Sequence, residues 1–331
     1  MSEGTAPLAA LRQKIDGIDD ALHDLLMQRA EIADAIRESK TDGPVWRPAR
    51  EAQVLRRLLE RHGGSFPRAT VVQIWREIIS AMVRLQGEFA VAVYAPENNR
   101  ICRDMARDHF GAETPFSFYS TARAVLTAVQ DRSASVGVLP APEEGEDTPW
   151  WPILAGMSGD RPAVCARLPF APPPPGNGDA ALCVALVPPE ESGSDRSLFA
   201  LRTNPQVSRA RLNEAIAASG IKPRRLIGTP ARKDDTSLFL AELEGFAGPD
   251  DGRIARLTDP DAGIAEAAIY LGVYATPFDA SALAESLERV FERARTAIDN
   301  RSETDLAVQA QVLAGGFQRL LFEAALTAAV E

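Results

Sequence analysis

Leu11-Arg-Gln-Lys-Ile-Asp-Gly-Ile-Asp19 lies near the start of the pattern that decides the fold of the first part of this 331-residue chain. No proline occurs between Leu8 and Lys40, and apolar residues recur every three or four positions, as on one face of a helix. These are Leu8, Leu11, Ile15, Ile18, Leu22, Leu25, Leu26, Ile32 and Ile36. A helix of this length spans roughly 50 Å, much more than an average globular helix, so we expect partners along its whole length.

Two cations of this predicted helix share a face. Arg29 and Lys40 are eleven positions apart, which places them roughly 16 Å apart along the axis with nearly the same direction. Their long side chains can therefore bind one small dianion between them. Arg12 lies about 25 Å from Arg29 along the same axis, so it can reach that ligand only from a second chain.

Two shorter helices follow the first. Gly43-Pro44 ends the long helix, and a second helix is predicted from Pro48 to Arg61. A third is predicted over residues 68–86, with an apolar stripe that ends one turn before Gln86. If Gln86 is buried, its amide needs a hydrogen-bond partner.

Several short pieces of these helices together resemble the all-helical chorismate mutases. The pieces are Leu-Arg-Gln-Lys-Ile-Asp around Arg12, Leu-Leu-Met-Gln-Arg-Ala around Arg29, Glu-Ser-Lys40, Arg47-Pro-Ala-Arg-Glu51 and Ile-Ile-Ser-Ala-Met-Val-Arg-Leu-Gln86. The resemblance implies three-helix chains that interlock as a homodimer and bind chorismate.

The resemblance also implies roles for individual residues. Arg12 of the partner chain and Arg29 would bind substrate carboxylates, and Lys40 and Gln86 would be the catalytic residues that hydrogen-bond the breaking ether oxygen.

In addition, the resemblance implies that Arg50 helps to bind a substrate carboxylate and that Glu51 holds the ring hydroxyl of the substrate. Met82 would contact substrate where the family often has a small hydroxyl residue, and Arg47 stands near a position that is often acidic. We expect these two departures to alter substrate contact without removing the chemistry.

These residue types suit a pericyclic rearrangement of chorismate to prephenate. Such a reaction needs a bound conformer and donors near the developing negative charge, so no cofactor or metal is expected. Because the implied catalytic groups do not titrate near pH 7, activity should be flat across neutral pH.

Composition limits the other possibilities. A net charge of −10 argues against a nucleic-acid partner, and the sequence has no apolar run of about twenty residues that would suggest a membrane span. Three cysteines without paired spacing indicate a reduced, cytoplasmic protein.

Strands alternate with helices after Gln86, which predicts a small parallel αβ layer over residues 89–180. This stretch resembles a shortened prephenate dehydratase, chiefly in element order and in Val136-Gly-Val-Leu-Pro140. The family's Thr-Arg-Phe motif is replaced by Ala181-Leu-Cys183, so dehydratase activity is not expected.

A third unit is predicted over residues 181–279, with strands near 197–203, 224–227, 236–245 and 270–274 and helices near 208–219 and 259–268. This βαββαβ order resembles an ACT domain, which implies an amino-acid effector at a subunit interface. The usual ligand turn is replaced by Pro205-Gln-Val207, so a structural or dimerising role is equally open.

The predicted fold is therefore multidomain α plus α/β: a helical chorismate mutase unit at 1–88, the αβ layer at 89–180, the ACT-like unit at 181–279 and amphipathic helices at 280–331. The leading function is chorismate mutase. The alternatives are a metabolite-sensing or assembly protein whose mutase unit has decayed, and an isochorismate pyruvate lyase built on the same helices.

Overall fold

The computed structural model describes residues 8–39, 44–63, 66–97, 100–171, 179–229, 237–261 and 264–279. The chain divides into two units, Met1–Ala280 and Ser281–Glu331, and all the described residues belong to the first. The helices expected over residues 280–331 lie outside the described residues.

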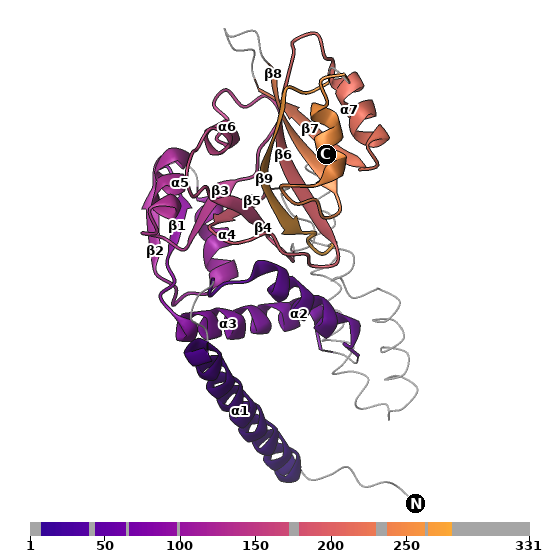
Figure 1. The fold of residues 1–331 in the computed structure, drawn as a ribbon. Helices are drawn as coiled ribbons and strands as arrows, with labels where there is room; N and C mark the ends of the chain where they lie inside the picture. The colour runs from indigo at the N-terminus through magenta and orange to yellow at the C-terminus, as the bar shows by residue number, and fades with distance from the viewer. Residues whose placement is uncertain are drawn as a thin grey trace, which may run out of the picture. The chain divides into compact units, whose positions relative to one another are not determined.

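The N-terminal part is helical, as the sequence predicts (Figure 1). Helix α1 runs over Leu8–Ser39, α2 over Pro48–Glu60 and α3 over Arg68–Gln86. Proline is favourable at the first position of α2, where its missing N–H has no intrahelical partner to lose. Helix α3 contacts α1, α2 and α4.

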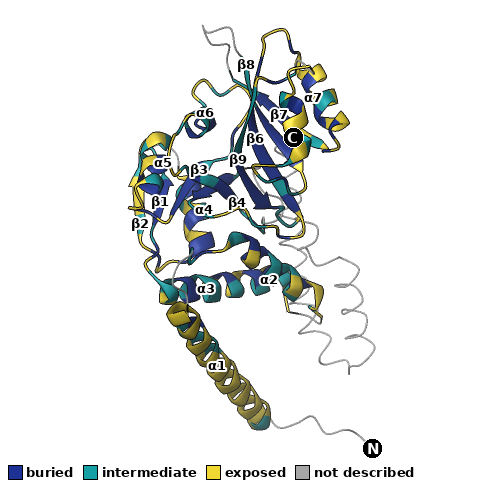
Figure 2. Ribbon diagram, viewed as in Figure 1, coloured by how far each residue is buried: buried dark blue, intermediate teal, exposed yellow. Residues whose placement is uncertain are grey.

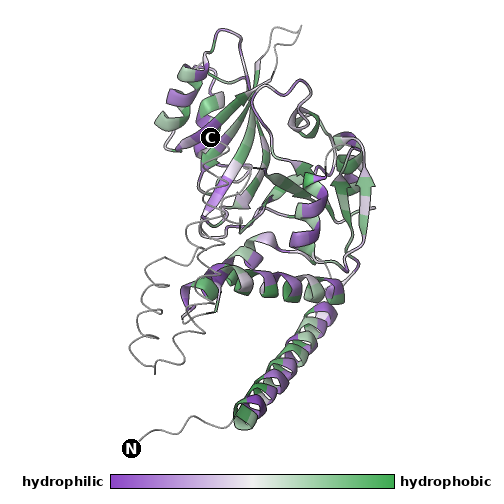
Figure 3. Cartoon of the chain, turned by 180° about the vertical axis from the view of Figure 1, so that it is seen from behind, coloured by the Kyte–Doolittle hydropathy of each residue, from purple (hydrophilic) through white to green (hydrophobic). Residues whose placement is uncertain are grey.

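Helix α1 exposes the apolar stripe that the sequence predicts (Figure 2). Ala33 is its buried residue, whereas eight of the nine residues of the predicted stripe are between 40% and 62% exposed. They are Leu8, Leu11, Ile15, Ile18, Leu22, Leu25, Ile32 and Ile36. Hydrophobic and hydrophilic residues alternate along the helix in Figure 3. Within the described residues, this face of α1 therefore stays largely exposed.

Among the described residues, nine strands form one mixed sheet in the order β2-β1-β3-β5-β4-β9-β6-β8-β7. Its first half contains β1 (Val91–Tyr94), β2 (Phe116–Tyr119), β3 (Val136–Pro140), β4 (Ala163–Leu168) and β5 (Ala181–Ala185). Strand β1 pairs in parallel with β2 and β3, whereas β5 is antiparallel to both β3 and β4.

Two helices contact the strands of this half of the sheet, α4 (Ile101–Phe110) and α5 (Ala122–Gln130). The short helix α6 (Trp151–Ala155) contacts strand β9. Helix α5 begins where the Thr121 side chain accepts a hydrogen bond from the Ala124 N–H. The parallel β1-β2-β3 layer is as predicted, but β4, β5 and α6 are additional elements.

The second half contains β6 (Asp195–Thr203), β7 (Pro223–Gly228), β8 (Ser237–Glu244) and β9 (Ala267–Ala275). Strand β6 is antiparallel to β8 and β9, and β7 is antiparallel to β8. Helix α7 (Arg209–Ala218) is capped by Ser208, and α8 (Gly252–Ala255) continues into a 3₁₀ turn over Arg256–Thr258. The element order is βαββαβ, as expected. The helix predicted at 259–268 is wrong: the helical turns lie earlier, over residues 252–258, and strand β9 already begins at Ala267.

The two halves meet where β4 pairs in parallel with β9, at Val164 and Gly272. Gly272 has a φ of +146°, and a Cβ atom there would lie 2.1 Å from the Val164 carbonyl oxygen. Only glycine permits this close approach of the two backbones.

Candidate functional site

The two arginines of α1 have different surroundings. Arg12 is exposed, whereas Arg29 is half-buried. The Nη1 atom of Arg29 is buried without a hydrogen-bond partner among the described residues. Burial also lowers the pKa of Arg29 from its ordinary value. A buried guanidinium donor without an acceptor is favourable only if an anion or another acceptor reaches it.

The continuous α1 helix keeps Arg12 and Arg29 about 25 Å apart within one chain. The structure therefore does not bring these two residues together in a single protomer. Lys40, the other half of the expected anion clamp, lies outside the described residues.

Gln86 and Met82 lie one turn apart at the end of α3. Met82 is buried, and Gln86 is half-buried. The Gln86 amide Nε2 donates a 3.2 Å hydrogen bond to the Met82 carbonyl oxygen of its own helix. The side-chain amide expected from the sequence thus has a local partner.

Arg50 and Glu51 are adjacent in sequence, but they face different surroundings at the start of α2. Arg50 is exposed, and its Nη1 donates a 3.3 Å hydrogen bond to Gln53 Oε1. Glu51 is buried, and its Oε2 accepts a 3.1 Å hydrogen bond from Trp46 Nε1. The other carboxylate oxygen of Glu51 pairs with Arg76 Nη1.

Glu51, Arg76 and His109 form a buried polar cluster between α2, α3 and α4. Arg76 Nη1 lies 3.0 Å from His109 Nε2, and its guanidinium lies 5.3 Å from the centre of the Phe170 ring. Burial lowers the pKa of Arg76, whereas Glu51 acts in the opposite direction. Burial first, and then Arg76, hold the pKa of His109 well below 6.5. A neutral His109 can accept the hydrogen bond from Arg76.

Sequence reasoning missed this cluster. Arg76 falls on the helix α3 pattern as an ordinary charge, and His109 lies near the end of α4, in a different predicted unit. The available signal was the indole N–H of Trp46 five residues before Glu51, which needs an acceptor if it is buried.

A second contact connects α2 to the sheet. Arg56 donates 2.9 Å hydrogen bonds to the carbonyl oxygens of Ser192, Ser194 and Thr276. Together with the buried cluster, this contact joins the helical region to residues far along the chain.

Within the described residues, no group of three or more His, Cys, Asp or Glu side chains is arranged to hold a metal ion. None of the described helices has the length and apolarity that crossing a membrane requires.

Comparison with known proteins identifies the helical region. The family model for chorismate mutase type II matches residues 11–87. The bifunctional chorismate mutase/prephenate dehydratase of Aquifex aeolicus is 36% identical over 139 residues, which are 40% of this chain and 38% of the relative. The protein of the same description from Neisseria gonorrhoeae is 32% identical over 135 residues, 41% of this chain and 37% of the relative.

Among solved structures, prephenate dehydratase from Streptococcus mutans aligns with a TM-score of 0.41 at 15% identity, covering 56% of this chain and 97% of that chain. The matches to the two curated relatives span less than half of the length of each relative. The resemblance of the N-terminal helices to the chorismate mutases is confirmed: residues 11–87 match the type II family of these enzymes.

Proposed function

We propose that this chain is a chorismate mutase that converts chorismate to prephenate in aromatic amino-acid biosynthesis. One observation carries the proposal: every residue assigned to the site, from Arg12 to Gln86, falls inside the segment that matches the chorismate mutase type II family. The helices expected for that family are present as α1, α2 and α3.

The state of Arg29 supports its role in binding a substrate carboxylate. Its buried Nη1 has no acceptor among the described residues, and a carboxylate would supply one. Lys40 and Gln86 would donate to the ether oxygen as negative charge develops on it. For this, the Gln86 amide would exchange its bond to the Met82 carbonyl for one to the substrate.

An interlocked homodimer would complete the site. The exposed apolar residues of α1 lie on one face of the helix and do not occur singly, as scattered surface residues do. A second α1 helix would cover this face. The same arrangement would bring Arg12 of one chain into the site that contains Arg29 of the other. Both substrate carboxylates would then meet a guanidinium.

The assignments of Arg50, Glu51 and Met82 stay predictions. Arg50 is exposed, and it would exchange its hydrogen bond to Gln53 for one to a carboxylate. Glu51 uses two of its roughly four acceptor positions for Trp46 and Arg76, so a ring hydroxyl would have to approach one of the others.

The remaining proposals concern the rest of the chain. The βαββαβ order of β6 to β9 supports an ACT-like unit, in which an amino-acid effector would bind between subunits. Cys102, Cys165 and Cys183 are free and buried, which supports the expected cytoplasmic location.

The direct test is to give the purified full chain chorismate. The proposal predicts loss of chorismate absorbance, with phenylpyruvate appearing only after acid treatment. Phenylpyruvate without acid would instead indicate dehydratase activity, pyruvate would indicate the lyase, and unchanged chorismate would indicate a decayed mutase. Lys40→Ala should raise the barrier by about 3 kcal/mol, as for a lost oxyanion donor. Lys222→Ala, at an exposed lysine paired with Glu244, is the matched control.

A further inference from the structure

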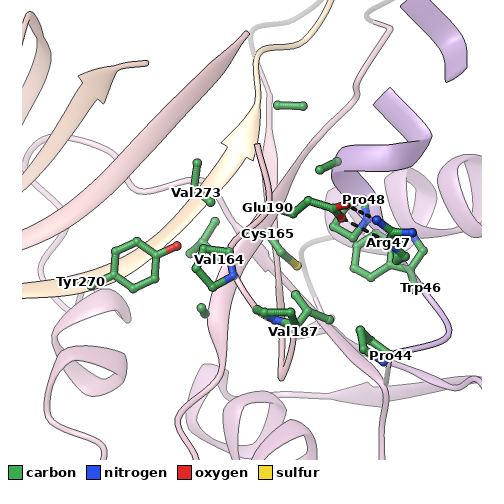
Figure 4. Close-up of a pocket in the computed structure, with 15 residues that line it drawn as sticks. Pro44, Trp46, Arg47, Pro48, Val164, Cys165, Val187, Glu190, Tyr270 and Val273 are labelled. Atoms are coloured by element: carbon green, nitrogen blue, oxygen red, sulfur yellow. Dashed lines mark hydrogen bonds and ion pairs between the residues drawn. The ribbon is translucent and has the colours of Figure 1, made fainter. Parts of the chain in front are cut away.

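A cavity of about 370 Å³ lies outside the residues assigned to chorismate. It forms where four separate segments meet: the start of α2, strand β4, the loop over residues 187–190 and strand β9 (Figure 4). We call it the α2–β9 pocket. Its volume is in the range of cavities that bind small molecules.

The walls of the α2–β9 pocket are mainly apolar. Trp46, Val164, Val187 and Val273 line it, and the Tyr270 ring closes one side (Figure 4). The ring of Tyr270 is fixed from behind by an edge contact with Phe199, with 5.5 Å between the ring centres. Such walls favour an aliphatic or aromatic group over a charged one.

Opposite charges lie together on the side of the pocket away from Tyr270. Arg47 Nε lies 3.4 Å from Glu190 Oε2, and a second, shorter contact joins Arg47 Nη2 to Glu190 Oε1 (Figure 4). Both side chains are solvent-exposed, by 50% and 34%. An exposed ion pair contributes little stability, so a ligand can separate the two charges at small cost. The mutase resemblance gives Arg47 no role in binding chorismate.

The start of α2 adds to the positive side of the pocket. Pro48 and Ala49 line it, and the Arg47 side chain does not cap the helix. N–H groups in the first turn of a helix lack intrahelical acceptors and lie at the positive end of the helix dipole. A ligand carboxylate near Arg47 would gain from both.

The charge arrangement selects among ligand classes. A ligand with only a carboxylate would sit beside the Glu190 carboxylate, and one with only an ammonium group would sit beside Arg47. A zwitterion can satisfy both, with its carboxylate on Arg47 and its ammonium group on Glu190. We propose that the α2–β9 pocket binds a free α-amino acid with a large apolar side chain, which fills the space between Trp46 and Tyr270.

The test is isothermal titration calorimetry of the full chain with L-leucine and L-phenylalanine. It needs no enzymatic activity, so its result is separate from the proposed mutase function. Binding of at least one of these amino acids is expected. The singly charged analogues 3-phenylpropanoate and 2-phenylethylamine should each bind about tenfold or more weakly than L-phenylalanine, because each leaves one member of the ion pair without a partner.

Variants then locate the bound amino acid. Arg47→Gln and Glu190→Gln should each weaken binding about tenfold, and both are exposed enough to leave the fold intact, which circular dichroism can verify. Val187→Phe, which fills the pocket, should abolish binding. Arg209→Gln removes another exposed Arg–Glu pair, with Glu144, and should leave binding unchanged.

Two results would overturn the proposal. One is no measurable heat with either amino acid up to about 10 mM. The other is binding that is unaffected by Arg47→Gln and Glu190→Gln, which would place the amino acid elsewhere in the chain.

Discussion

Replacing Arg76 by methionine is expected to destabilise the folded chain by about 3 to 5 kcal/mol, because it leaves Glu51 as a buried charge without a cation. Arg76 and Glu51 are each 7% exposed, so water cannot replace the lost partner. Methionine keeps much of the side-chain length, and the effect of the missing charge is therefore larger than the effect of missing volume.

The contacts of Arg76 set this magnitude. Glu51 keeps a single hydrogen bond, 3.1 Å from Trp46 Nε1, and His109 Nε2 loses its 3.0 Å donor. The guanidinium also leaves the Phe170 ring, a cation–π contact that contributes about 0.5 to 2 kcal/mol. These losses are coupled through one side chain, so they fall within the single range above instead of adding to it.

Urea denaturation followed by tryptophan fluorescence measures the change in free energy of unfolding. Lys222→Met breaks an exposed ion pair with Glu244 and should change it by less than about 1 kcal/mol. Adding Glu51→Gln to Arg76→Met should recover part of the loss, because the buried charge is then removed. An Arg76→Met variant as stable as Lys222→Met would refute the reasoning.

Three further predictions concern other parts of the molecule. The pKa of His109 is held well below 6.5, so the folded chain binds fewer protons there than the unfolded chain and loses stability as pH falls below that value. The slope is at most about 1.4 kcal/mol per pH unit. In denaturation at several pH values, the free energy of unfolding of His109→Gln should fall less steeply below pH 6.5 than that of the unchanged chain. The same slope in both proteins would contradict this prediction. Gly272→Ala should destabilise by about 3 kcal/mol or more, since its Cβ meets the Val164 backbone. By contrast, Gly17→Ala has open space in α1 and should stabilise by about 0.5 to 1 kcal/mol in thermal denaturation; the reverse order would be inconsistent with the structure. Ile18→Glu, at a side chain 58% exposed in one chain, should convert the proposed dimer to monomers in light scattering, whereas a persisting dimer would count against the α1 interface.

The three N-terminal helices could be predicted almost to the residue because their signals are local. The 3.6-residue period of apolar residues defines α1. Pro48 is the first residue of α2, and Gly87 directly follows the last residue of α3. The same holds for β1, β2 and β3, whose runs are separated by clear helices.

Strands β4 and β5 were not predicted from the sequence, for a physical reason. Both are short and largely buried on both faces, so they lack the alternation that marks a half-buried strand. Strand β9 shows the opposite effect. Its alanine-rich start was predicted to be helical, but pairing with β6 over Ala267–Ala275 overrides that local preference.

The residues of the candidate site were predicted from short sequence motifs, but the contacts that surround them were not. Nothing in local periodicity indicates that Glu51 meets Arg76 or that Arg76 meets His109, since 25 and 33 positions separate the partners of these pairs. Likewise, the Arg47–Glu190 pair depends on a separation of 143 positions. Contacts of this kind follow from the packing of whole elements.

We propose that a small dianion is bound by arginines from two chains. Refolding a mixture of Arg12→Ala and Arg29→Ala chains tests this shared site. Each mixed dimer would contain one site with both arginines intact, so an equal mixture should regain about a quarter of the wild-type chorismate mutase activity while each variant alone is nearly inactive. A mixture no more active than the two separate variants would contradict a shared site.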